Sequence, residues 1–143
     1  MSVPFEKIHE AAPDVLPKAR SHEVYNNPFI TLSSLYELCS DDEALTELVD
    51  NTLMYCLRYT ETVCKFEQIV SKQNGTNESA EARREIEEIR TRTHDATIDA
   101  INILSREMHK KGVNNTWISK VSKMGRPGYM KFAILLAFEA VLK

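Results

Sequence analysis

The stretch from Glu78 to Lys111 contains neither proline nor glycine, and this constrains the fold more than any other feature of the chain. It is rich in Glu, Ala, Arg, Ile and Leu, whose side chains suit a helix. Acidic residues are concentrated near its start, where the helix dipole favours negative charge. Gly112 follows Lys110 and Lys111 at its end, as is typical of a helix C-terminus. The sequence therefore predicts one long helix that ends at Gly112.

One face of this helix is apolar or small when successive residues are placed about 100° apart. Its middle consists of threonine and alanine, which predicts that a partner helix approaches closely. We expect the threonine hydroxyls to bond to carbonyls one turn back. Ile103 lies at the edge of this face. The residues predicted to face the core are Ile86, Ile89, Thr93, Ala96, Thr97, Ala100, Ile101, Leu104 and Met108.

A second long helix is predicted from Ser40 to about Gln73. Ser40-Asp41-Asp42-Glu43 has the pattern of a capping box, in which the Ser40 hydroxyl accepts a hydrogen bond from the Glu43 amide. Apolar residues then recur at alternating steps of four and three, as in a heptad seam. They are Leu45, Val49, Thr52, Cys56, Tyr59, Val63, Phe66 and Val70. Asn74-Gly75 predicts a turn, so we expect the two long helices to pair as an antiparallel hairpin.

Shorter elements flank the hairpin. Residues 1–27 contain three prolines and predict an irregular N-terminal arm, and Asn27-Pro28 starts a short helix that runs to about Cys39. A further short helix is expected over Thr116–Met124, and Gly125-Arg126-Pro127-Gly128 predicts a break. The apolar stretch Tyr129–Lys143 predicts a buried helix, either in the groove of the hairpin or at a subunit interface. The sequence thus indicates a single all-α domain over residues 1–143, an antiparallel helical bundle built on a long two-helix hairpin with shorter flanking helices.

The charge of the chain is unevenly distributed. The whole sequence has 18 Lys and Arg against 21 Asp and Glu. From Arg106 onward, however, eight basic residues accompany only Glu107 and Glu139. Basic and aromatic residues together can hold a nucleic-acid backbone and stack on bases, so nucleic-acid binding is one alternative. The acidic body would repel a polyanion, and nucleic acid is therefore not the expected partner. The residues that carry this alternative are Trp117, Lys120, Lys123, Arg126, Tyr129 and Lys131.

The cysteines suggest a reducing compartment. Cys39, Cys56 and Cys64 form neither a CxxC pair nor a cluster with histidine, so reduced thiols in a cytoplasmic protein are expected. No signal peptide is recognisable, and the apolar C-terminal stretch is too short to span a bilayer. We therefore expect no membrane association.

The polar face of the long helix carries the residues that we single out as a candidate binding stripe. Neighbouring His94 and Asp95 resemble the His-Asp pair of metal-dependent phosphohydrolases, which need further His and Asp ligands on other helices. Adjacent helical residues diverge by about 100°, so these two are not expected to point at one ion. We interpret these residues as a solvated or partner-facing stripe, with a catalytic or metal site as the less favoured alternative, and assign no catalytic residue, metal ligand or cofactor. The stripe consists of Arg90, His94, Asp95, Asp99, Asn102 and Arg106.

Two resemblances bear on function. Glu47-Leu-Val-Asp50 before an apolar run resembles the second half-motif of the all-α nucleoside triphosphate pyrophosphatases, whose other half is a Glu-x-x-Glu on the preceding helix. Here Glu85-x-x-Glu88 lies downstream instead. The stretch from Glu85 to Met108 is similar to a small bacterial all-helical family of unknown function, which implies a helical fold and no known activity. The leading hypothesis is a non-enzymatic protein-interaction or oligomerisation module. A homodimer is one form that such a module can take. The alternatives are a metal-dependent nucleotide phosphohydrolase and a nucleic-acid-binding protein.

Overall fold

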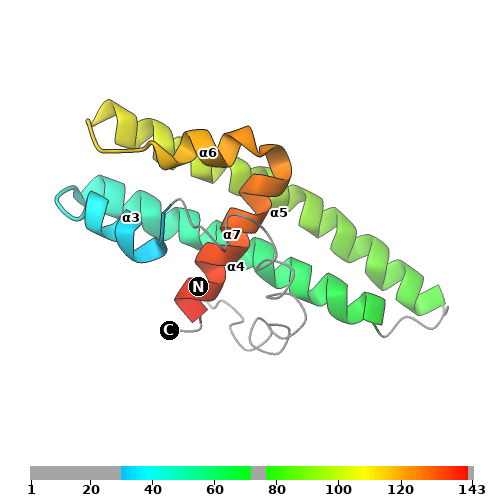
Figure 1. Cartoon of the computed structure of the whole chain (residues 1–143). Helices are drawn as coiled ribbons and strands as arrows, with labels where there is room; N and C mark the ends of the chain where they lie inside the picture. Colours follow the sequence, from blue (N-terminus) through cyan, green and yellow to red (C-terminus); the bar gives the residue numbers. More distant parts are fainter. Residues whose placement is uncertain (1–29, 72–76, 142–143) are drawn as a thin grey trace.

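The computed structural model describes residues 30–71 and 77–141, except for the side chains of residues 64–71, 77–80, 82, 83 and 141. Throughout these ranges the regular structure is α-helical, which confirms the predicted fold class. The predicted arm over residues 1–27 and the predicted turn at Asn74-Gly75 lie outside the described residues. Figure 1 shows two long helices side by side, with the shorter helices packed against one side and one end of the pair.

The two long helices are α4 (Glu43–Ser71) and α5 (Asn77–Lys110), and they pair as the antiparallel hairpin that the sequence predicts. Their backbones approach closely where the residues are small. The Thr97 hydroxyl lies 3.3 Å from the Tyr55 carbonyl of α4, and the Thr52 hydroxyl lies 3.5 Å from the Ala100 carbonyl of α5. Each hydroxyl also donates to a carbonyl one turn back in its own helix, at 2.6 Å for Thr97 and 2.7 Å for Thr52. The prediction of a tight crossing with satisfied threonines is therefore confirmed.

The buried residues of α5 follow the predicted apolar face with one clear error. Thr97, Ile101, Leu104 and Met108 are fully or almost fully buried, and Ile86 and Ala100 are buried as well. Ile89 was expected to face the core, but 40% of its surface is exposed. Ile103, at the edge of the predicted apolar face, is 43% exposed. Burial extends instead to Ser105, whose carbonyl and hydroxyl accept hydrogen bonds from the Asn115 side-chain amide at 2.9 and 3.1 Å. The predicted apolar face was therefore centred too far from Ser105.

The C-terminus of α5 ends as predicted. Gly112 has φ of +71°, a conformation that side chains with a Cβ rarely adopt. The Val113 amide donates to the Met108 carbonyl at 2.8 Å, and the Gly112 amide donates to the His109 carbonyl at 3.1 Å. These two bonds form a Schellman motif, which satisfies carbonyls that the helix leaves unpaired.

The start of α4 differs from the predicted capping box. Asp42 is the N-cap, since its Oδ1 accepts from the Leu45 amide at 3.0 Å, whereas the Ser40 hydroxyl donates backward to the Glu37 carbonyl at 2.9 Å. Asp42 also forms an ion pair with Lys111 at 3.0 Å, which joins the start of α4 to the end of α5. The hydrogen bond from Lys111, followed by that from the Leu45 amide, holds the pKa of Asp42 below its usual value. Asp42 rather than Ser40 serves as the cap because Asp42 directly precedes Glu43, the first residue of α4, whereas Ser40 is the C-cap of α3.

The short helix before α4 is α3 (Leu32–Cys39), which starts later than expected because Thr31 is its N-cap. The Thr31 hydroxyl accepts from the Ser34 amide at 3.1 Å. Leu32, Leu35 and Cys39 are buried, whereas Leu38 is 38% exposed. Cys39 and Cys56 are both free thiols, and burial raises the pKa of Cys56 to about 12.

Two helices complete the described chain: α6 (Trp117–Lys123), which matches its predicted position, and α7 (Gly125–Val141). The predicted break is only partly correct, because the helix already begins at Gly125. Pro127 falls in its first turn, where the missing amide is not needed. Figure 1 shows α7 crossing α4 and α5 of the hairpin. The side chains from Phe132 to Phe138 are buried, so α7 is an internal helix.

Contacts with α3 and α6 fix the position of α7. The Leu32 amide of α3 donates to the Glu139 carboxylate at 2.7 Å. The rings of Trp117 and Phe132 stack with their centres 5.5 Å apart, which joins α6 to α7. None of the described helices has the length and apolarity needed to cross a membrane.

Candidate functional site

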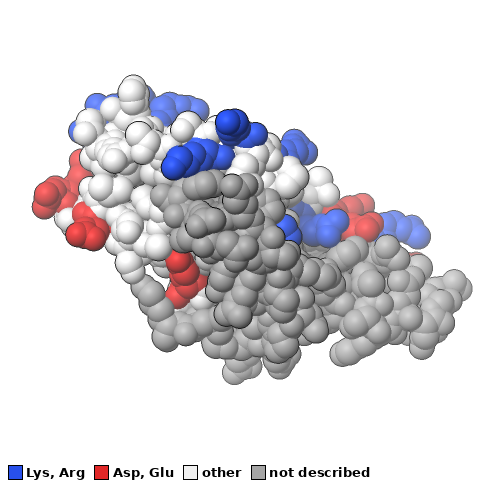
Figure 2. All heavy atoms as spheres, viewed as in Figure 1, with Lys and Arg blue, Asp and Glu red and all other residues white. Residues whose placement is uncertain are grey.

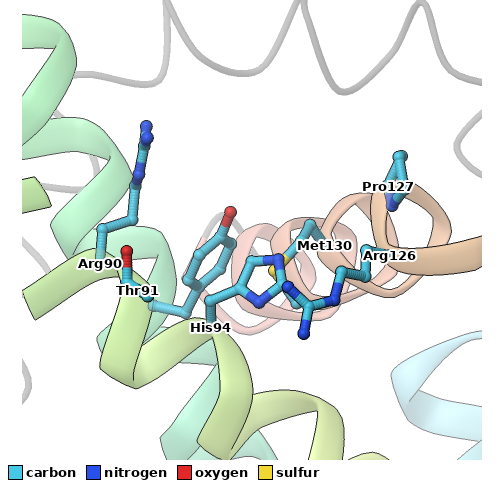
Figure 3. Close-up of a pocket in the computed structure, with 7 residues that line it drawn as sticks. Arg90, Thr91, His94, Arg126, Pro127 and Met130 are labelled. Atoms are coloured by element: carbon cyan, nitrogen blue, oxygen red, sulfur yellow. The ribbon is translucent and has the colours of Figure 1, made fainter. Parts of the chain in front are cut away.

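The structure brings part of the predicted binding stripe to a cleft of about 350 Å³ between α4, α5 and α7. Figure 3 shows Arg90 and Arg126 on opposite sides of His94, with the Arg126 guanidinium directed toward the imidazole. Arg90 and His94 are one turn apart on α5, and Arg126 comes from the first turn of α7. The residues that line the cleft are Tyr59, Arg90, Thr91, His94, Arg126, Pro127 and Met130.

A shared carboxylate joins α5 to α7 at the rim of the cleft. The Nδ1 atom of His94 lies 3.3 Å from Oδ1 of Asp95, and Nη2 of Arg126 lies 3.5 Å from the same oxygen. The sequence predicted that His94 and Asp95 do not point at one ion; in the structure the two side chains contact each other, and the Asp95 carboxylate lies between the imidazole and Arg126. The side chains of Asp95 and Arg126 are 57% and 72% exposed. An ion pair this exposed contributes little stability, so an incoming anion can compete for Arg126.

Tyr59 forms the inner wall of the cleft. Its ring is buried and meets the His94 ring edge-on, with ring centres 6.0 Å apart and planes at 76°. Burial raises the pKa of Tyr59, and the positive charge of Arg90 acts in the opposite direction. The phenol therefore stays protonated at neutral pH and carries an O–H that can donate a hydrogen bond.

The chemistry of the cleft suits an anionic group. Two guanidinium groups and an imidazole border it, and none of its described lining residues is acidic. The first turn of α7 adds the partial positive charge of a helix N-terminus. Guanidinium groups form strong, charge-assisted hydrogen bonds to carboxylate and phosphate oxygens. Met130 and Pro127 supply an apolar wall, which fits a group attached to a larger molecule rather than a free ion alone.

The other predicted stripe residues lie elsewhere. Asn102 is half-buried, and its Oδ1 accepts from the Tyr129 hydroxyl at 2.8 Å, so it fastens α7 to α5. Asp99 borders a different groove of about 200 Å³ between α4 and α5, and Arg106 is exposed. The six predicted residues therefore do not form one site. Only Arg90, His94 and Asp95 come together.

Sequence reasoning missed Tyr59 and Arg126 as partners of this stripe. Tyr59 was assigned to the apolar seam of α4, which is correct for its burial, and Arg126 was assigned to a break in the basic segment. Neither residue has a spacing relationship to His94, because both reach the cleft from other helices. The basic residue next to Pro127 at a helix start is the one local signal that could have suggested Arg126.

The two acidic residues of the pyrophosphatase-like half-motif, Glu47 and Asp50, lie at the protein surface. Glu47 is exposed, and Asp50 accepts a hydrogen bond of 2.5 Å from the Tyr36 hydroxyl. Partial burial first, and then the hydrogen bond and charge of Asp50, raise the pKa of Tyr36. Among the side chains that the structure describes, no three of His, Cys, Asp or Glu are grouped closely enough to hold a metal ion.

The basic C-terminal quarter has exposed charges but no exposed aromatic rings. Figure 2 shows Lys and Arg gathered over α6 and the start of α7, and acidic side chains at the turn between α3 and α4. Trp117 and Tyr129 are 3% and 9% exposed. These two rings are therefore placed to support the core rather than to stack on bases, contrary to what base binding would require of them.

Comparison with known proteins adds no assignment. No family model, curated protein or solved structure matches this chain.

Proposed function

We propose that this protein is a non-enzymatic interaction module that holds an anionic group of a protein partner in the cleft between α5 and α7. One observation carries the proposal: Arg90 and Arg126 come from separate helices and border the same cleft, with His94 between them. A carboxylate or phosphate group offers the kind of acceptor oxygens to which guanidinium groups form charge-assisted hydrogen bonds.

The long contacts of Asp95 favour binding over simple structural pairing. Asp95 bridges the imidazole and Arg126 at distances of 3.3 and 3.5 Å, which are long for charge-assisted hydrogen bonds. An anion from a partner would form shorter hydrogen bonds with Arg126 than Asp95 does, and the apolar wall of Met130 and Pro127 would pack against its stem.

The first test is a titration with inorganic phosphate followed by amide NMR shifts. We expect the largest shifts at residues around Arg90, His94 and the first turn of α7. The variants Arg90→Met and Arg126→Met should each weaken phosphate binding about tenfold, equivalent to about 1.4 kcal/mol, because each removes a charged donor. Lys123→Met is the matched control, since it removes an exposed positive charge from α6 without touching the cleft.

Two results would count against the proposal. Equal loss of phosphate binding in Lys123→Met would mean that the general positive charge attracts phosphate. Turnover of a nucleotide panel with Mg²⁺ or Mn²⁺ would favour the phosphohydrolase alternative, which stays a prediction of the sequence.

A further inference from the structure

Helix α5 carries a stripe of exposed charged residues along most of its length, and we call it the α5 stripe. The residues repeat at steps of four and seven, which keeps them on one face of a helix. Asp99 also borders the groove between α4 and α5, so the stripe runs beside this groove. All members are exposed to solvent. They are Glu81, Glu85, Arg92, Asp99, Arg106 and Lys110.

The order of charges along the α5 stripe lets two copies of α5 that run in opposite directions place opposite charges against each other. When a second α5 runs antiparallel, Glu85 faces Arg106 and Glu81 faces Lys110, while Arg92 faces Asp99 in the middle. The helix dipole explains charge preferences only in the first and last turns. It does not explain Arg92 and Asp99, which lie far from both ends of α5. A random arrangement would bring some like charges together in this register, whereas all three of these pairs are opposite.

Apolar residues lie beside the same stripe. Ile89 and Ile103 are 40% and 43% exposed, and each is seven residues from the small residue Ala96. A two-fold axis near Ala96 places Ile89 of one copy against Ile103 of the other. Ile103 also borders the groove of about 200 Å³ between α4 and α5, together with Leu48 and Tyr55. The groove gives Ile89 of the second copy an apolar surface to contact.

We infer that the occupant of this face is a second copy of the chain, with the two α5 helices antiparallel across a two-fold axis near Ala96. Such an interface is isologous, because the same patch serves both copies. The ion pairs select the antiparallel register, and the exposed isoleucines supply apolar burial. This association is independent of the anion cleft, since Arg90, His94 and Arg126 are not part of the stripe.

The test exchanges the central charges. Arg92→Asp places two acids opposite each other twice in the symmetric pair, and Asp99→Arg does the same with two bases. Each single variant should raise the dimer dissociation constant roughly tenfold or more, because attraction becomes repulsion at two symmetric positions. The double variant Arg92→Asp with Asp99→Arg should recover wild-type association. Sedimentation equilibrium over a concentration series measures all four proteins.

Mixing gives a second readout, since the two single variants carry complementary charges and should associate with each other more tightly than either does with itself. Lys123→Glu on α6 is the control for altered net charge and should leave association unchanged. A wild-type chain that stays monomeric at the highest concentrations would overturn the inference. So would a double variant that associates no better than the singles. Circular dichroism of each variant establishes that loss of association is not loss of fold.

Discussion

Replacement of Phe132 by alanine is expected to lower the free energy of unfolding by about 3–5 kcal/mol. Phe132 is 1% exposed, and its ring stacks on Trp117 with an angle of 25° between the planes. Truncation removes apolar burial and leaves a cavity where α6 meets α7. It also removes an aromatic pair worth about 0.5–1.5 kcal/mol beyond its buried area. Both terms act in the same direction, so this should be among the largest effects of a single substitution in the chain.

Urea unfolding followed by far-ultraviolet circular dichroism measures this loss. Phe132→Leu keeps most of the side-chain volume and should lose clearly less stability than Phe132→Ala. Ile103→Ala removes an exposed apolar side chain and should change stability by less than about 0.5 kcal/mol in the monomer. A loss below about 1 kcal/mol for Phe132→Ala would mean that α6 and α7 do not pack as described.

Gly128→Ala is the second substitution with a large expected effect, a loss of about 1–3 kcal/mol. In an ordinary helix the change from glycine to alanine would stabilise by about 0.5–1 kcal/mol. Here a Cβ atom on residue 128 would lie 2.5 Å from the Met124 Cβ and 2.8 Å from the Val121 carbonyl oxygen. A backbone oxygen cannot move aside as a flexible side chain can, so α6 and α7 must separate. The steric effect therefore outweighs helix propensity and reverses the sign.

The control is Gly112→Ala, which separates crowding from backbone strain. Gly112 has positive φ, but a Cβ there would meet nothing within 4 Å. Its replacement should cost about 1–2 kcal/mol through the left-handed conformation alone. Because α7 carries Arg126, Gly128→Ala should also weaken phosphate binding, whereas Gly112→Ala should not. Unchanged stability in Gly128→Ala would contradict the close contact between the two helices.

Features set by neighbouring residues were predictable from the sequence. The end of α5 at Gly112 and the hydroxyl bonds of Thr97 depend on residues within one turn, and both are confirmed. The antiparallel pairing of α4 and α5 followed from the turn predicted between two long helices, and the burial of α7 followed from its composition.

The errors arise where a neighbouring element decides between local options. Ser40 and Asp42 can both cap a helix, but Ser40 is the C-cap of α3 and Asp42 directly precedes α4. Ile89 fits the apolar face by angle, yet it remains exposed, whereas Ser105 is buried and bonds to Asn115. The start of α7 at Gly125 depends on the sharp turn after α6, which the sequence indicated only as a break.

The candidate site could be predicted only in part for the same reason. Arg90, His94 and Asp95 were recognisable as a polar stretch on one helix, and the structure brings them together. Which of the six predicted residues reach the cleft, and which lie apart from it (Asp99, Asn102 and Arg106), depends on where α7 crosses α5. Tyr59 and Arg126 reach the cleft from α4 and α7, and no periodicity in one segment can reveal such a meeting.

The most direct test of the account is a double-mutant cycle on phosphate binding with Arg90→Met, Arg126→Met and the combined variant, measured by calorimetry. If both guanidinium groups hold the same anion, the combined loss should differ from the sum of the single losses by more than about 0.5 kcal/mol. Additive losses, or wild-type affinity in the combined variant, would contradict a shared anion site between α5 and α7.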